Sequence, residues 1–208
     1  MKIIVICIGA LFITIDLFSQ DNAPLTKKPK KFTYSFNSGF GYYLPFRSSI
    51  GLADRGAVNQ FNFQCNYKNH FFTHLYFDMA DINYSKKNTI VNNVVSYFDF
   101  KLNANNVGLD LGYALPVKKF SPYIYTGLGV SFMDTPFIKP GDAANEIVFG
   151  TKTKTFLQYR GAIGVDYEIS HYFILYLEGI YSSTAFKSVL DHQQLQGASL
   201  LLGFKTPL

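Results

Sequence analysis

Two oppositely charged residues, Arg160 and Glu178, each interrupt an apolar segment between Leu157 and Tyr181. A turn at Glu168–Ser170 would place these two residues directly opposite each other on neighbouring antiparallel strands. Side chains in that relation have Cβ atoms about 5 Å apart, which is within reach of an ion pair. Because a buried charge without a partner is costly, the sequence predicts that Arg160 and Glu178 pair inside the fold. We expect three further acidic residues in the same interior polar network: Asp78, Asp110 and Asp166.

The four histidines are the residues best suited to bind a metal or to act as a catalytic base. His70 and His74 are four positions apart, and on a strand this spacing separates them by about 13 Å at about 3.3 Å per residue. Two ligands that far apart do not share one metal ion. His171 borders a predicted turn, and His192 lies in a predicted long loop. We therefore expect isolated polar or interfacial histidines, with neither a metal nor a cofactor.

Ser188, Asp191 and His192 are close in sequence and have the residue types of a hydrolase triad. Catalytic triads are defined by geometry, however, and proximity in the sequence does not create one. The acidic segment Asp134–Glu146 lacks the regular spacing of oxygen ligands that a calcium loop requires. We predict no catalytic residue, and an enzyme that modifies membrane lipid is kept as an alternative.

Apolar and polar residues alternate along most of the chain after residue 31, and this pattern must position the charged residues. In Phe32–Tyr42 the even positions carry mainly Phe and Tyr, whereas the odd positions carry Thr, Ser, Asn and Gly. This period of two predicts a β-strand with one apolar and one polar face. The other predicted strands are Val58–Tyr67, Phe71–Ala80, Tyr97–Pro116, Ser121–Phe132, two strands within Leu157–Tyr181, and Leu195–Lys205. The alternation slips by one residue near Asn105–Asn106, which predicts a β-bulge.

The predicted connections alternate between long and short. The long ones are Leu44–Ala57, Tyr84–Tyr97, Asp134–Thr153 and Ser183–Leu195, and the short ones are Lys68–His70, Leu115–Ser121 and Glu168–Ser170. Eight strands joined in this way form a meander whose tight turns all lie at one end, as in outer-membrane barrels. The sequence thus predicts an all-β fold, an eight-stranded antiparallel up-and-down transmembrane β-barrel over residues 32–208.

The composition of the polar face indicates which face of the strands points inward. Charged residues make up only 16% of the chain, whereas soluble domains have about 25%. The polar face is mostly Thr, Ser, Asn, Gln, Gly and Tyr, which suits the crowded interior of a barrel, where we expect glycines to make room for Tyr and Arg. A soluble lipocalin-like ligand-binding barrel, with its apolar face inside, is the alternative. Aromatic residues near strand ends are expected at the bilayer interfaces: Tyr42, Tyr67, Tyr113, Tyr123, Tyr159, Tyr167, Tyr181 and Phe204.

The N-terminal segment has the features of an export signal. Lys2 precedes an apolar run, Ile3–Ile15, which is short for a spanning helix of about 20 residues. We predict that residues 1–19 form a signal peptide cleaved after Ser19, with an uncleaved anchor as the alternative. Residues 20–31 are then a basic polar tether in the periplasm. Cys65 is left as the one cysteine of the mature chain, so we expect no intramolecular disulfide.

The segment Leu109–Phe132 contains a strand ending in Gly-Tyr, a short turn, Pro-Tyr, Gly-x-Gly and an aromatic residue. It resembles small outer-membrane β-barrel domains of the OmpA/OmpX and PorT-like kind, and the resemblance extends from Phe32 to the C-terminus. Ser19-Gln20 is similar to the end of many signal peptides of Bacteroidota. The resemblance implies a place in the outer membrane of a Gram-negative bacterium. For PorT-like members it also implies an association with secretion and surface assembly.

The function class that the sequence favours is a non-enzymatic outer-membrane barrel with a structural, surface-binding or assembly-associated role. Its expected partners are outer-membrane lipids, the barrel assembly machinery and an unidentified surface or periplasmic protein. Nucleic acid is excluded because the chain is exported. A small pore is a further alternative, although eight strands leave an interior only wide enough for side chains.

Overall fold

The structure is a computed structural model that describes residues 31–46, 53–68, 70–91, 94–140, 147–185 and 195–208. The described residues all belong to one compact unit, Lys31–Leu208. The predicted signal peptide and residues 20–30 of the predicted tether lie outside the described residues. Both therefore stay predictions.

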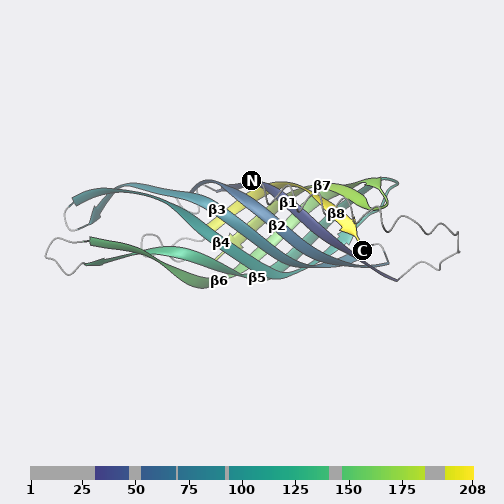
Figure 1. The fold of residues 1–208 in the computed structure, drawn as a ribbon, viewed down its shortest axis with the longest axis horizontal. Helices are drawn as coiled ribbons and strands as arrows, with labels where there is room; N and C mark the ends of the chain where they lie inside the picture. The colour runs from purple at the N-terminus through teal and green to yellow at the C-terminus, as the bar shows by residue number, and fades with distance from the viewer. Residues whose placement is uncertain (1–30, 47–52, 69, 92–93, 141–146, 186–194) are drawn as a thin grey trace, which may run out of the picture. The chain divides into compact units, whose positions relative to one another are not determined.

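The described residues form antiparallel strands that close into one barrel (Figure 1). The strands are β1 (Phe32–Pro45), β2 (Ala53–Tyr67), β3 (Phe71–Val91), β4 (Val94–Ala114), β5 (Phe120–Pro140), β6 (Ile147–Ser170), β7 (Phe173–Thr184) and β8 (Leu195–Pro207). Each strand pairs with its neighbours in the chain, and β1 pairs with β8 to close the ring. The prediction of an eight-stranded up-and-down β-barrel is confirmed. Within the described residues, no helix is long and apolar enough to span a membrane.

The connections at one end of the barrel are short, and we call this the short-turn end. They lie between β2 and β3, between β4 and β5, and between β6 and β7. The last of them is the turn His171–Tyr172. The predicted turn at Glu168–Ser170 is wrong, because β6 continues through Ser170.

At the opposite end, two hairpins are longer than predicted. The predicted loop Tyr84–Tyr97 is largely strand, because β3 extends to Val91 and β4 starts at Val94. The predicted loop Asp134–Thr153 is also mostly strand, with β5 extending into it from one side and β6 from the other. Figure 1 shows the β3–β4 and β5–β6 hairpins continuing past the ends of the other strands. We call these two extensions the long hairpins.

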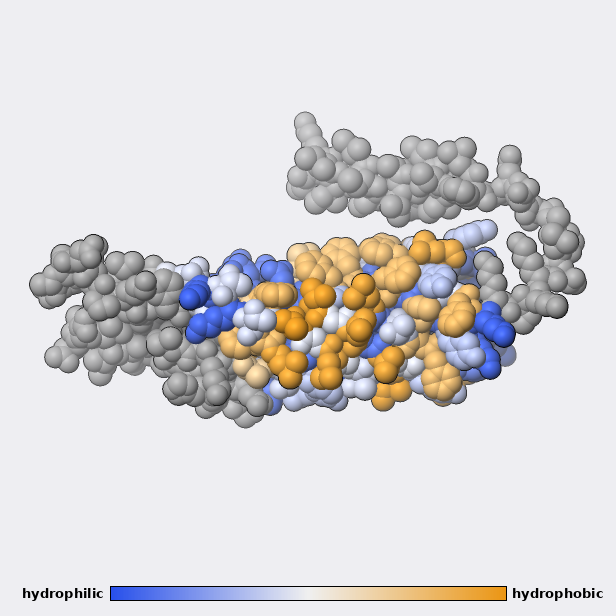
Figure 2. Space-filling view, turned by 90° about the horizontal axis from the view of Figure 1, so that it is seen from below, coloured by the Kyte–Doolittle hydropathy of each residue, from blue (hydrophilic) through white to orange (hydrophobic). Residues whose placement is uncertain are grey.

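Large apolar side chains cover the outside of the strands. Phe40 is 65% exposed and Leu111 is 71% exposed, and similar residues occupy the outward positions of all eight strands. Figure 2 shows them as a hydrophobic band, with hydrophilic residues beside it in the direction of the strand ends. So much exposed apolar surface is stable in lipid and not in water. The apolar face therefore points outward, which overturns the lipocalin-like alternative.

The barrel interior is mostly polar towards the short-turn end, where Phe72, Tyr123 and Tyr125 also lie, and mostly apolar towards the long hairpins. Its apolar part is formed by Tyr43, Val58, Ala80, Ile82, Leu102, Ala104, Met133, Ile180, Leu195 and Leu201. The predicted bulge near Asn105–Asn106 is wrong, because β4 keeps an unbroken register with β3 from Phe98 to Tyr113. Leu102 and Asn106 both point inward. The pairing of β4 with β3 is regular here. The alternation slips in the sequence because the inward side chains change from apolar to polar along the strand.

Candidate functional site

Arg160 on β6 lies at the centre of the interior polar network. Its Nε and Nη2 atoms donate to the two carboxylate oxygens of Asp110 on β4 at 2.9 and 2.5 Å. Its Nη1 atom donates to Oδ2 of Asp78 on β3 at 2.5 Å. The guanidinium carbon also lies 3.3 Å from the ring centre of Tyr76. Arg160 is 1% exposed, so these contacts replace the hydration of its charge and fix its position in the barrel lumen.

Gly127 makes the contact between Asp110 and Arg160 possible. It lies on β5 between them, because Asp110 pairs with Gly127 and Gly127 pairs with Arg160. A Cβ atom at this position would overlap Oδ1 of Asp110. Other glycines leave room for tyrosine rings: Gly39 and Gly203 for Tyr176, Gly108 and Gly129 for Tyr76, and Gly164 for Tyr123. The prediction that glycines make room for bulky interior side chains is confirmed.

Glu178 does not pair with Arg160, so that prediction is wrong. The turn at His171–Tyr172, together with an irregularity between Glu168 and Ser170, sets the register between β6 and β7, and this register places Ser182 opposite Arg160 and Gly164 opposite Glu178. Both charged residues do point inward and are almost fully buried. The alternation of the sequence was enough to predict that both side chains point inward. Their partners depend on the register of the strands, which alternation does not give.

Tyr123 and Tyr125 point into the barrel from β5 and share the carboxylate of Glu178. Their hydroxyls donate to Oε2 and Oε1 of Glu178, each at 2.8 Å. Tyr123 is 5% exposed, so its predicted place at the bilayer interface is wrong. It has the same parity as Tyr125, and alternate residues of a strand share one face. Two hydroxyl donors therefore hold this buried carboxylate in place of the predicted guanidinium.

His74 belongs to the network and is not an isolated residue, in contrast to the prediction. Its Nε2 atom lies 2.9 Å from Oε1 of Gln64, and its Nδ1 atom lies 3.3 Å from Oδ2 of Asp110. The same Gln64 oxygen accepts hydrogen bonds from Nδ2 of Asn37 at 2.9 Å and from Nζ of Lys205 at 3.3 Å. His74 thus connects the Arg160 contacts to polar residues on β1, β2 and β8.

Lys205 links the last predicted acid to the network, because its Nζ atom lies 2.9 Å from Oδ2 of Asp166. Of the predicted network residues, the structure joins Arg160, Asp78, Asp110 and Asp166 through successive contacts, and it places Glu178 beside them with its two tyrosines. Lys205 was missed by the sequence reasoning. The signal for it was its parity, which it shares with the inward residues of β8.

The seven other predicted interface aromatics point outward. They are Tyr42, Tyr67, Tyr113, Tyr159, Tyr167, Tyr181 and Phe204. Near the short-turn end, four of them pack against a second ring: Phe32–Tyr67 at 5.2 Å, Phe71–Tyr113 at 5.2 Å, Phe120–Tyr167 at 4.9 Å and Phe173–Phe204 at 5.8 Å between ring centres. Aromatic rings arranged in this way are typical of the interface between lipid and water.

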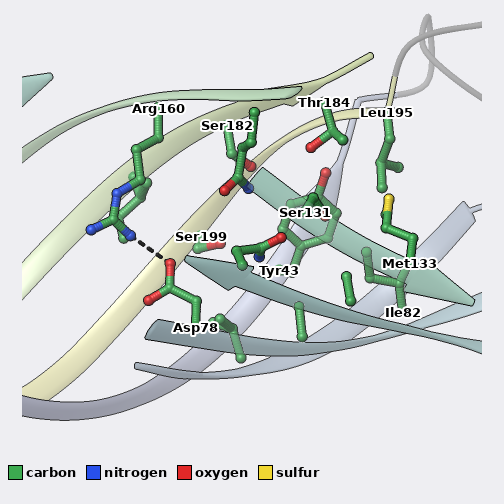
Figure 3. Close-up of a pocket in the computed structure, with 16 residues that line it drawn as sticks. Tyr43, Asp78, Ile82, Ser131, Met133, Arg160, Ser182, Thr184, Leu195 and Ser199 are labelled. Carbon is green, nitrogen blue, oxygen red and sulfur yellow. Dashed lines mark hydrogen bonds and ion pairs between the residues drawn. The ribbon is translucent and has the colours of Figure 1, made fainter. Parts of the chain in front are cut away.

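A cavity of about 30 Å³ lies inside the barrel on the side of Arg160 that faces the apolar section. Figure 3 shows Arg160 and Asp78 at one end of this cavity and Met133, Ile82 and Leu195 at the other. Its volume is about that of one water molecule. In the described part of the chain, no group of three or more His, Cys, Asp or Glu residues is placed to hold a metal ion. Ser188, Asp191 and His192, which have the residue types of a triad but for which we predict no catalytic role, lie outside the described residues.

The long hairpins separate from each other above the closed part of the barrel. Pairing between β4 and β5 ends at Ala104 and Met133, although both strands continue. On the outer sides, β2 starts at Ala53 and β7 ends at Thr184, so neither accompanies the hairpins further. Among the described strands, the extensions of β3, β4, β5 and β6 therefore each pair on one side only.

No family model and no curated protein matches the chain. Solved structures do. The outer membrane protein OprG from Pseudomonas aeruginosa gives a TM-score of 0.58 at 12% identity, covering 86% of this chain and 97% of that chain. Neisserial surface protein A gives 0.54 at 11% identity, with 86% and 99% covered. Ail, the attachment invasion locus protein of Yersinia pestis, solved with the heparin analogue sucrose octasulfate, gives 0.51 at 9% identity, with 86% and 100% covered. The chain therefore has the fold of small outer-membrane β-barrels of the OmpA/OmpX-like kind.

Proposed function

We propose that this chain is a non-enzymatic protein of the outer membrane of a Gram-negative bacterium, and that it acts by binding a partner at the cell surface through its long hairpins. The proposal includes export by the N-terminal signal peptide. In barrels of this type the short turns face the periplasm and the long connections face outward. The long hairpins then stand on the external side.

The packed interior is the observation that carries this proposal. Arg160, Asp110 and Asp78 meet across the lumen, and large apolar side chains such as Met133 and Leu201 fill the section beyond them. The cavity between these two layers has room for about one water molecule. A lumen filled in this way favours a function outside the barrel over the passage of solutes.

The interior also gives little support to catalysis. Among the described interior residues, the pair that resembles a catalytic dyad is His74 with Asp110. Each of these two residues is at most 1% exposed. A substrate has no access to a pair buried at this depth. An enzyme that modifies lipid stays the alternative, and it would have to use residues outside the interior network.

The free strand edges of the long hairpins favour a partner that binds as an added strand. An unpaired edge presents a row of backbone N–H and C=O groups, and an extended segment of another protein satisfies them by β-augmentation. Two hairpins with a gap between β4 and β5 offer such edges facing each other. A secreted or surface-assembled protein would supply the extended segment, which is consistent with the role that PorT-like resemblance implies.

A sulfated or otherwise anionic glycan is a second candidate partner, favoured by charge. Lys152 and Lys154 alternate with threonines at the start of β6, where all these side chains are exposed. Lys101 is exposed on β4. The structure of Ail contains a heparin analogue, and exposed lysines attract such polyanions.

Conductance and binding measured on the same purified barrel test the proposal. We expect no channel conductance in a planar bilayer, because the interior is packed. If the glycan is the partner, we expect the barrel to be retained on immobilised heparin. The double substitution Lys152→Glu with Lys154→Glu should then abolish this retention. If retention is unchanged or absent, a variant with both long hairpins shortened distinguishes strand addition, since it should lose the surface proteins that co-purify with the intact chain. Stable conductance of the folded protein would refute the proposal.

A further inference from the structure

Three polar residues stand side by side on the wall of the interior cavity. Asp78 on β3 pairs with Asn106 on β4, and Asn106 pairs with Ser131 on β5. Inward neighbours in register have Cβ atoms about 5 Å apart, so the three side chains form one row. All three line the cavity next to Arg160, and Figure 3 labels Asp78 and Ser131 among the lining residues.

Each of these residues has a buried oxygen atom without a hydrogen-bond partner. The atoms are Oδ1 of Asp78, Oδ1 of Asn106 and Oγ of Ser131. Asp78 and Asn106 are each 6% exposed, and Ser131 is fully buried. Buried polar atoms in native proteins nearly always have a partner. Three such oxygens around one cavity therefore indicate that the cavity holds something that interacts with oxygen.

The charge of the interior indicates what that is. Among the described residues, the interior contains four carboxylates, those of Asp78, Asp110, Asp166 and Glu178, and two basic groups, those of Arg160 and Lys205. With His74 counted as neutral, negative charge is in excess. Lys205 pairs with Asp166, and Arg160 is shared between Asp110 and Asp78. The second oxygen of Asp78, Oδ1, has no hydrogen-bond partner, and buried charge in that state is costly.

The ligands and the volume restrict the type of ion. The row offers oxygen atoms alone, which suits hard cations and not the metals that prefer nitrogen or sulfur. Calcium affinity depends on the number of charged ligands, and magnesium needs near-ideal octahedral geometry, whereas the row has one carboxylate, that of Asp78. The cavity, at about 30 Å³, has the volume of about one water molecule. We propose that Asp78, Asn106 and Ser131 bind one small monovalent cation, Na⁺ or K⁺, inside the barrel.

The cation dependence of stability tests this site in solution. The full barrel, folded in detergent, is unfolded with urea in NaCl, in KCl and in the chloride of N-methyl-D-glucamine, which is too large for the cavity, at equal ionic strength. We expect a higher urea midpoint in Na⁺ or K⁺ than in the large cation, because an ion that binds the folded state stabilises it. Asp78→Asn should abolish this difference. Ser131→Ala should raise the apparent Kd about tenfold or more, as seen when groups around a metal are removed.

Ser35→Ala is the matched control. Ser35 is also a buried serine that points inward, but it lies on β1 with its hydroxyl bonded to Asn37 and does not line the cavity. This variant should keep the full cation dependence. Asp78→Asn is tested for folding by its gel shift on heating. If that shift is lost, the cation dependence of the urea midpoint is compared between Ser131→Ala and Ser35→Ala instead.

Crystals soaked in thallium(I), which replaces K⁺, locate the ion directly. We expect an anomalous peak within bonding distance of the oxygens of Asp78, Asn106 and Ser131. Equal urea midpoints in all three salts, with no peak at this place, would overturn the proposal. The cavity would then hold a water molecule, which donates to the two acceptors and accepts from the hydroxyl.

Discussion

Arg160 should be energetically coupled more strongly to Asp110 than to Glu178. The perturbation is a pair of double-mutant cycles, Arg160→Met with Asp110→Asn and Arg160→Met with Glu178→Gln. Arg160 makes two hydrogen bonds to Asp110, at 2.9 and 2.5 Å. Glu178 receives its hydrogen bonds from two tyrosines.

The size of each coupling follows from these contacts. Removing one partner of a buried ion pair costs about 3–5 kcal/mol, because the other charge is left without compensation. Asp110→Asn after Arg160→Met should therefore cost much less than in the wild type, and we expect a coupling of about 2 kcal/mol or more. Arg160 and Glu178 both contact Tyr125, whose ring centre lies 5.4 Å from the guanidinium carbon and whose hydroxyl donates to Glu178. Because neighbours that share a partner can couple, we expect a coupling between Arg160 and Glu178 that is clearly smaller than the coupling between Arg160 and Asp110.

The assay is unfolding in urea of the barrel in detergent micelles, with linear extrapolation of the free energy of unfolding. The chain contains no Trp, so the folded fraction is followed by gel mobility without boiling and by far-UV circular dichroism. A large coupling between Arg160 and Glu178, with additivity between Arg160 and Asp110, would refute the register of β6 against β7 described above.

Three further substitutions test other parts of the interior by the same unfolding assay. Gly127→Ala should destabilise the barrel by about 1–3 kcal/mol, the usual range for overpacking, whereas Gly161→Ala, where a Cβ would meet its nearest atom at 3.6 Å, should be neutral; equal effects would contradict the close approach at Gly127. Leu201→Ala should cost about 2–5 kcal/mol as a buried large-to-small change, and the lipid-facing Leu200→Ala should cost clearly less, so the reverse order would show that the strand faces are exchanged. Tyr125→Phe should cost about 1–3 kcal/mol because it leaves a buried carboxylate oxygen without its donor, and an unchanged free energy of unfolding would mean that this hydrogen bond is absent.

The barrel itself could be predicted from the sequence because strand alternation and connection length are both local properties. Segments such as Phe32–Tyr42 show on their own which residues share a face. The short turns at Lys68–His70 and Leu115–Ser121 show on their own where neighbouring strands reverse. Neither feature requires knowledge of distant contacts, and together they determine strand order in a meander.

The partners inside the barrel could not be predicted in the same way, because they depend on exact register and on contacts across the lumen. A turn placed at Glu168–Ser170 instead of His171–Tyr172 was enough to assign the wrong partner to Arg160. Its true partners come from β3 and β4, which do not neighbour β6. No pairing rule for adjacent strands detects such a contact. It depends on the width of the barrel and on the missing side chain at Gly127.

The misread phase of β4 has a physical cause that also locates the membrane boundary. Alternation shows which face is more apolar, and in the lipid-facing region that face is the outside. On β4 near the long hairpins the relation is reversed, since Leu102 is buried in the interior while Lys101 and Asn103 are exposed on the outside. An outward lysine beside an inward leucine is the pattern of a barrel wall in water. The exchange of polarity between Val107, which is outward and apolar, and Asn103 therefore marks the level at which β4 leaves the lipid.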